Sequence, residues 1–224
     1  MSWDDTAETG PLHEVYPDPA LAERSDAAAA LRELSEALVG HAADAAVLGE
    51  LSAWARKASA ELRTGARLER GEDYQRRRYL DPPPPDGAEL LTFSDRPISG
   101  PANPAALAMR IRREGNEAVA RVVFDRRAES SPGRAHGGIT ASVFDDVMGY
   151  VNVIDGVAAY TLELSVRYVA GMPLHTPVEV RARTVEADER RSTVTAEARV
   201  VEDGTLVGEA RAVFALIPRA RLGL

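Results

Sequence analysis

Much of the C-terminal half of the chain alternates between apolar and polar residues with a period of two, which is typical of β-strands. "AMRIRREGNEAVARVVFD" predicts two strands that turn at Glu114–Asn116, and "TPVEVRARTVEAD" predicts a third strand. "STVTAEARVVEDGTLVGEARAVFALI" predicts a hairpin with its turn at Glu202–Gly204. "YTLELSVRYV" alternates cleanly, with Leu162, Leu164, Val166 and Tyr168 on one face and Thr161, Glu163, Ser165 and Arg167 on the other. We therefore expect about six strands.

One stretch among these strands has a helical pattern instead. Within "SPGRAHGGITASVFDDVMGY" (131–150), the pattern predicts a helix over residues 138–150, with most of its circumference apolar. The polar remainder consists of Ser142, Asp145, Asp146 and Gly149. A helix that is apolar over so much of its surface is mostly buried, so the long strands are expected to pack on it. The pattern predicts an α+β fold, in which an antiparallel sheet wraps around a central helix.

The first 85 residues follow a different pattern. The first ~24 residues are polar and contain several prolines, so we expect a loose arm there. Residues 25–71 are rich in Ala, Leu, Glu and Arg with helical spacing, and Ser25 or Asp26 is a plausible N-cap. Gly40 either separates two helices or lies within one. "DPPPPDG" (81–87) breaks any helix, so we divide the chain into a helical extension (1–85) and a main domain (86–224). The extension is expected to pack on the core or on a partner subunit.

Composition excludes several kinds of function. The formal net charge of −8 argues against broad binding to nucleic acid or anionic membranes. The chain has no cysteine, which excludes disulfides and thiol nucleophiles, and His13, His41 and His175 lack the spacing of metal ligands. We therefore predict neither a metal nor another cofactor. The acidic start has no signal-peptide pattern and no apolar segment approaches the ~20 residues of a membrane span, so we expect a cytoplasmic protein.

The chemistry of the chain centres on the start of the buried helix. Gly137 and Gly138 allow a close approach to the backbone, and a helix N-terminus exposes amide donors. Such a donor could polarise a carbonyl oxygen, while a carboxylate two turns further along attacks the carbonyl carbon or activates water. By itself, the spacing between the glycine pair and the carboxylate does not distinguish a catalytic acid from one that is merely solvated.

The combination resembles the hotdog-fold acyl-CoA thioesterases, in particular the phenylacetyl-CoA-pathway type and its human thioesterase-superfamily relatives. The resemblance spans Pro97 to Pro218 and leaves the N-terminal ~80 residues outside. It is carried by the Pro/Gly turn of "SPGRAHGG", by His136-Gly-Gly, and by an acid, Asp145, nine positions after the histidine. The order of strands around the motif helix also fits.

The resemblance implies a role for each matching residue. It implies that Asp145 is the catalytic carboxylate, either as general base or as nucleophile, and that Gly137 donates its N–H to the thioester oxygen. His136 is implied as an orienting residue and Thr161 as a hydroxyl that positions the water, with Gly138 beside the substrate. The family forms its site between subunits, which implies a homodimer or a dimer of dimers with acyl-CoA as the partner molecule.

Other candidates near the motif are open to two interpretations. Some relatives carry an asparagine six residues before the histidine, where this chain has Ser130, so Ser130, Glu129 or the partner chain would have to replace it. Arg134 is either a contact for a coenzyme A phosphate or an ordinary surface arginine. Asp146 is expected to be a solvated or salt-bridged neighbour of Asp145, with the two roles exchanged if the helix is rotated.

Two other functions remain open from the sequence. A non-catalytic acyl-CoA binding or regulatory module stays open because the asparagine six residues before the histidine is missing. A hotdog hydratase or dehydratase would use a histidine with an acid in another arrangement, which His136 followed by two glycines fits poorly.

Overall fold

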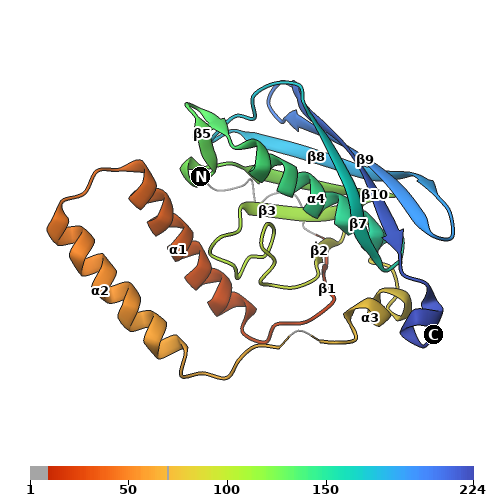
Figure 1. The fold of residues 1–224 in the computed structure, drawn as a ribbon, viewed down its shortest axis with the longest axis horizontal. Helices are drawn as coiled ribbons and strands as arrows, with labels where there is room; N and C mark the ends of the chain where they lie inside the picture. The colour runs from red at the N-terminus through yellow and green to blue at the C-terminus, as the bar shows by residue number, and fades with distance from the viewer. Residues whose placement is uncertain (1–9, 70) are drawn as a thin grey trace.

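The computed structural model describes residues 10–69 and 71–224 and contains one large sheet in that part of the chain (Figure 1). The strand order is β1-β2-β3-β4-β8-β9-β10-β7. Its long members are β3 (Ala108–Glu114), β4 (Glu117–Val123), β7 (Ala159–Tyr168), β8 (Pro177–Ala187), β9 (Arg191–Val200) and β10 (Leu206–Leu216). These six pair antiparallel, as expected, and the turns at 114–117 and 200–206 are confirmed. Two short strands, β5 (Glu129–Ser131) and β6 (Arg134–Ala135), form a separate hairpin.

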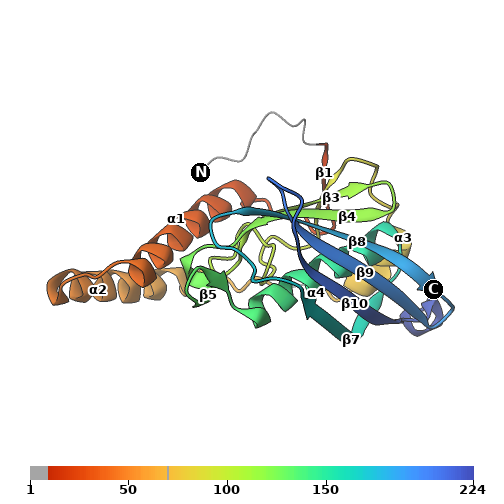
Figure 2. The same cartoon turned by 90° about the horizontal axis from the view of Figure 1, so that it is seen from above.

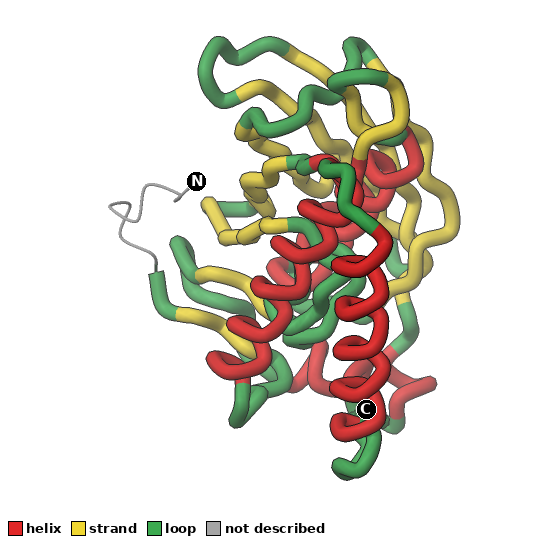
Figure 3. The backbone as a smooth tube through the Cα atoms, turned by 90° about the vertical axis from the view of Figure 1, so that its left-hand side faces the viewer, coloured by secondary structure: helices red, strands yellow, loops and turns green. Residues whose placement is uncertain are grey.

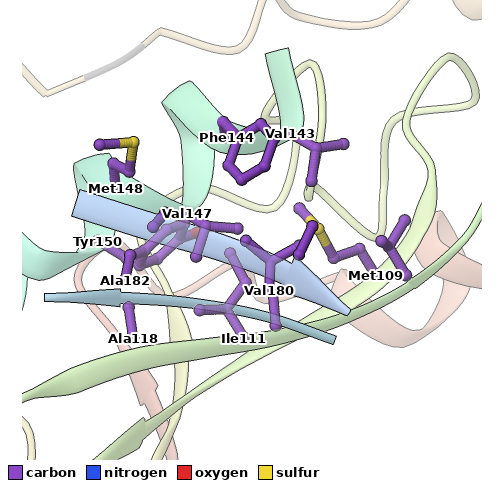
Figure 4. Packing of buried hydrophobic residues seen from close by; sticks show 14 of the residues in the cluster. Met109, Ile111, Ala118, Val143, Phe144, Val147, Met148, Tyr150, Val180 and Ala182 are labelled. Carbon is purple, nitrogen blue, oxygen red and sulfur yellow. The ribbon is translucent and has the colours of Figure 1, made fainter. Parts of the chain in front are cut away.

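The expected central helix is α4 (Gly137–Ile154), which packs on the inner face of the sheet. Val143, Phe144, Val147 and Met148 are at most 2% exposed, and Figure 4 shows them over Ile111, Val180 and other strand residues. The strands meet the helix largely with small side chains, among them Ala118, Ala120, Ala182, Ala196, Ala198 and Ala212, all of them buried. Small residues on the sheet let the helix approach closely, so the core is tightly packed although many of its side chains are small.

Strand β7 forms one edge of the sheet and contains a β-bulge that the alternating pattern did not predict. Its register shifts opposite Val213 and Phe214, where Glu163 pairs with Val213 but Thr161 pairs with Phe214, so that Leu162 is the extra residue. Phe214 is buried in the core, and cross-strand partners share a face, so Thr161 lies on the helix side. Leu164 pairs with the buried Ala212 and lies on that side too, so the predicted alternation, which put Thr161 on the face opposite to Leu164, was wrong.

The N-terminal region contains α1 (Leu21–Gly40), α2 (Ala45–Leu62) and α3 (Tyr74–Leu80), so Gly40 does separate two helices. The expected N-cap at Ser25 or Asp26 was wrong, because α1 begins at Leu21. Asp18 starts the helix instead: its side chain accepts from the N–H of Ala20 and its carbonyl from the N–H of Leu21. The helices α1 and α2 form a hairpin that extends beyond the sheet (Figures 2 and 3), and α2 buries none of its residues.

The expected loose arm is only partly described, since residues 1–9 lie outside the described residues. Within that arm, β1 (Leu12–Glu14) pairs in parallel with β2 (Glu89–Leu91), so the idea of a loose arm was wrong for these residues. The remaining short elements are the 3₁₀ helices Arg126–Ala128 and Arg219–Leu222. Across residues 10–69 and 71–224, none of the helices is both long and apolar enough to span a membrane.

Candidate active site

His136 forms the N-cap of α4, and its imidazole is turned back onto the helix. Its Nδ1 accepts from the N–H of Gly138 at 3.0 Å, and its backbone N–H donates to the carbonyl of Ala128 at 2.7 Å. Because Nδ1 is the acceptor, the neutral ring carries its proton on Nε2. The Gly138 amide is therefore used inside the motif, and the side chain of His136 is a capping group.

Each glycine of the pair has a close neighbour that accounts for its lack of a side chain. A Cβ on Gly138 would lie 3.1 Å from the His136 ring, and a Cβ on Gly137 would lie 3.3 Å from the ring of Tyr168. The N–H of Gly137 has no acceptor among the described residues, as is usual for the first turn of a helix. The two glycines thus make room for the side chains of His136 and Tyr168, and the N–H of Gly137 remains available as a donor.

Asp145 lies on the side of α4 that faces β7. Its carboxylate is partly exposed, and its Oδ1 accepts from the hydroxyl of Thr161 at 2.9 Å. The bulge at Leu162 is what aims Thr161 at this carboxylate, since regular alternation would turn it to the outer face. The hydrogen bond orients one carboxylate oxygen and leaves the other for a further partner.

Asp146, one residue further on, has the opposite environment. It is 6% exposed and is ion-paired with Arg96, whose Nε donates to its Oδ1 at 2.9 Å and whose Nη2 also contacts that oxygen. Arg96 further donates to the Thr92 hydroxyl at 3.0 Å and lies over the ring of Tyr150. Burial by itself would lower the pKa of Arg96, but Tyr150 and Asp146 outweigh it and raise that pKa above its ordinary value. The expectation of a salt-bridged Asp146 is confirmed.

The remaining sequence candidates lie on the β5–β6 hairpin. Ser130 and Arg134 are both exposed, and Arg134 donates from Nη1 to the carbonyl of Gly171 at 3.1 Å. Glu129 is occupied by the N–H of Gly133 at 2.7 Å and by Arg126 at 2.9 Å. Of the residues offered as substitutes for the missing asparagine, Ser130 is therefore the one whose side chain has no partner among the described residues.

Residues 132–207 match the model of the thioesterase superfamily. That stretch of the chain is therefore similar to the thioesterase superfamily. Among solved structures, a crystal structure described as a thioesterase superfamily protein aligns with 94% of this chain and 98% of its own length, at 22% identity and a TM-score of 0.76. That likeness confirms the hotdog-like fold, and it includes the N-terminal helices that lay outside the resemblance based on sequence.

Two further solved structures match about half of the chain. A hypothetical thioesterase from Streptococcus pneumoniae, solved with coenzyme A, is 18% identical over 49% of this chain and 86% of its own, with a TM-score of 0.47. The Escherichia coli PaaI protein from the phenylacetic acid degradation operon is 16% identical over 50% of this chain and 80% of its own, also with a TM-score of 0.47.

Gly137 and Asp145 lie on the same helix but are far apart for two groups that would act on one carbonyl group. Eight residues at a rise of 1.5 Å per residue place them ~12 Å apart along α4. His136, Gly137 and Gly138 therefore form one cluster with Tyr168, and Asp145 forms a second one with Thr161. A single chain therefore holds these two clusters apart rather than bringing them together.

Two residues that contact α4 were not recognised as such from the sequence. Tyr168 donates its hydroxyl to the carbonyl of Gly137 at 2.8 Å, although the alternation had placed it with the apolar residues of its strand. Arg96 lies in a loop 50 residues before Asp146, without periodicity that could link the two. A tyrosine at the end of an edge strand was the one available signal, because such a residue often keeps its hydroxyl near polar groups.

Two grooves of the described structure lie away from these clusters. A groove of about 530 Å³ on the outer face of the sheet is lined by arginines and glutamates such as Arg181, Arg211 and Glu197. A second groove of about 410 Å³ lies beside α1 and includes Leu21, Arg32 and Met109. Neither is lined by Gly137, Asp145 or Thr161. Among the described residues, no three His, Asp or Glu side chains gather in a way that could hold a metal ion.

Proposed function

We propose that this protein hydrolyses an acyl-CoA thioester to a free carboxylic acid and coenzyme A. The observation that carries the proposal is the Asp145 carboxylate, held at one oxygen by Thr161 and otherwise open, on the same helix that presents a spare amide at Gly137. The match of residues 132–207 to the thioesterase superfamily model supports the reaction class. The chemistry needs a positioned carboxylate and a preorganised amide donor, without a metal or redox cofactor.

In the proposed reaction the Gly137 N–H binds the thioester oxygen and stabilises the negative charge that develops there. Asp145 either removes a proton from water, whose oxygen then bonds to the carbonyl carbon, or attacks that carbon itself and is released by water afterwards. In both cases the C–S bond breaks, and the thiolate leaves as the coenzyme A thiol once it gains a proton. His136, Gly138, Ser130 and Arg134 lie close to Gly137 along the chain, and the exposed Arg134 is suited to a coenzyme A phosphate.

We propose that a second copy of the chain completes the site. The ~12 Å between Gly137 and Asp145 along one helix is too long for a shared carbonyl group, so the Gly137 of one chain would act with the Asp145 of another. Strand β7 offers the pairing surface, since it is a ten-residue sheet edge. Its side chains Tyr160, Leu162 and Tyr168 are each more than half exposed. A long apolar edge of this kind favours pairing with another strand.

Replacing Leu162 by glutamate is expected to weaken the dimer and to lower hydrolysis in the same proportion, because each copy would then lack half a site. Sedimentation velocity and activity should be measured over one series of protein concentrations. Val201→Glu is the matched control. Val201 is also an exposed aliphatic residue, with 42% of its surface exposed, but it lies in the β9–β10 turn and not on β7. A monomeric Leu162→Glu variant with full activity would contradict the shared site.

A panel of short-chain, medium-chain, long-chain and aromatic acyl-CoAs tests the proposed reaction. Purified protein is expected to release free thiol from at least one of them, as measured with a colorimetric thiol reagent. Coenzyme A should appear in equal amount to the free acid. Binding of several acyl-CoAs without release of thiol would favour the non-catalytic module instead, and formation or loss of a double bond or hydroxyl group in the acyl chain would favour the hydratase.

A further inference from the structure

The peptide unit between Gly137 and Gly138 is hydrogen-bonded at both of its ends. The hydroxyl of Tyr168 donates to the carbonyl of Gly137 at 2.8 Å, and the N–H of Gly138 donates to Nδ1 of His136 at 3.0 Å. The Tyr168 ring itself lies against Gly137, where an added Cβ would be 3.3 Å from it. Hydrogen bonds in such a chain polarise one another, so this peptide plane is fixed more firmly than either bond alone would fix it.

The preceding peptide unit, which contains the N–H of Gly137, is also held at its carbonyl end. The carbonyl of His136 accepts from the N–H of Thr140 at 3.0 Å and from the hydroxyl of Thr140 at 3.3 Å. The direction of the Gly137 N–H depends on the two dihedral angles at the Gly137 Cα, which lies between the two peptide units. Glycine has no side chain to restrict those angles, so the hydrogen bonds on either side have to do so.

We propose that Tyr168 is a positioning residue for the Gly137 amide donor of the thioester site, an inference that rests on the proposed function. Tyr168 does not touch the reacting atoms; it holds the peptide that follows the donor and so keeps the donor aimed at the developing oxyanion. An oxyanion donor acts through preorganisation, and a donor that is free to turn must be reoriented during the reaction. The hydroxyl of Tyr168 therefore affects the transition state more than it affects substrate binding.

The position of Tyr168 also couples the two halves of the site. Tyr168 stands near one end of β7 and Thr161 near the other, so a single strand holds the amide donor through Tyr168 and the carboxylate through Thr161. If β7 pairs with its copy in a dimer, formation of the dimer would fix both groups at once.

Tyr168→Phe tests this role, because it removes the hydroxyl and keeps the ring against Gly137. With the acyl-CoA that the wild type hydrolyses fastest, we expect kcat to fall about tenfold, less than the ~10²-fold or more that follows removal of an oxyanion donor itself, while KM stays nearly constant. The amide resonances of Gly137 and Gly138 should shift in ¹H–¹⁵N spectra. Tyr168 is 53% exposed, so the melting temperature should change little, and sedimentation should show an unchanged oligomer.

Tyr79→Phe is the matched control, because it removes another tyrosine hydroxyl that donates to a backbone carbonyl, that of Ile217 at 2.7 Å. This variant should keep the wild-type kcat and the two glycine resonances. A Tyr168→Phe variant with wild-type kcat, or with a loss confined to KM, would overturn the positioning role while leaving the thioesterase proposal intact. A wild-type protein that hydrolyses no acyl-CoA would overturn both.

Discussion

Asp145→Asn is expected to lower kcat for thioester hydrolysis by about 10²- to 10⁴-fold, the range for loss of a general base. The asparagine has nearly the same shape, and its amide oxygen can still accept from the Thr161 hydroxyl, which lies 2.9 Å from Asp145 Oδ1. A neutral amide, however, neither takes a proton from water nor attacks the carbonyl carbon. The loss should therefore appear in kcat, measured by thiol release, without a change in melting temperature or sedimentation.

The other end of α4 provides a matched control for this variant. Asp155 follows the last residue of the helix and accepts from the hydroxyl of Thr184 at 2.7 Å, so it is a second exposed Asp–Thr pair. Asp155→Asn makes the same chemical change outside the proposed site and should keep wild-type turnover. Asp145→Asn with the turnover of Asp155→Asn would remove Asp145 from the mechanism.

The outline of the fold could be predicted because it depends on local patterns. The β3–β4 and β9–β10 hairpins have strong turn sequences, and the apolar stretch after Gly138 is long enough to specify a buried helix. The direction of each side chain was less predictable. A single extra residue, Leu162, reverses the alternation of β7 and turns Thr161 toward the helix, and no local feature of "YTLELSVRYV" marks that bulge.

The sequence also could not distinguish the surroundings of the two adjacent acids. Successive residues on a helix point about 100° apart, so Asp145 and Asp146 must face different neighbours. Which of them meets a cation depends on Arg96, whose loop folds over α4 from a distant part of the chain. The contact between Tyr168 and Gly137 is non-local in the same way. Motif spacing could nominate residues, but pairings between distant segments required the structure.

Asp146→Asn is expected to destabilise the protein by about 3 kcal/mol, since it leaves the guanidinium of Arg96 without its carboxylate in a largely buried position. Arg96 has 22% of its side chain exposed and Asp146 only 6%, so water compensates little for the lost charge. Urea unfolding at one fixed protein concentration measures the free energy. Glu197→Gln is the control: it breaks the exposed pair with Arg199, in which both side chains are about half exposed, and should cost no more than about 1 kcal/mol.

Removing both charges together separates the cost of an unpaired charge from the value of the pair. Both arginine contacts fall on Oδ1 of Asp146, whereas Oδ2 is buried without a hydrogen-bond partner among the described residues. The native pair therefore recovers only part of the desolvation cost of the carboxylate. The double variant Arg96→Met, Asp146→Leu should regain most of the stability that Asp146→Asn loses, and a double variant less stable than Asp146→Asn would contradict this account. Because Asp146 lies next to Asp145, turnover should be measured as well: a double variant that regains stability but turns over more slowly than the wild type would mean that the ion pair sets the rotation of α4 that presents Asp145 to Thr161.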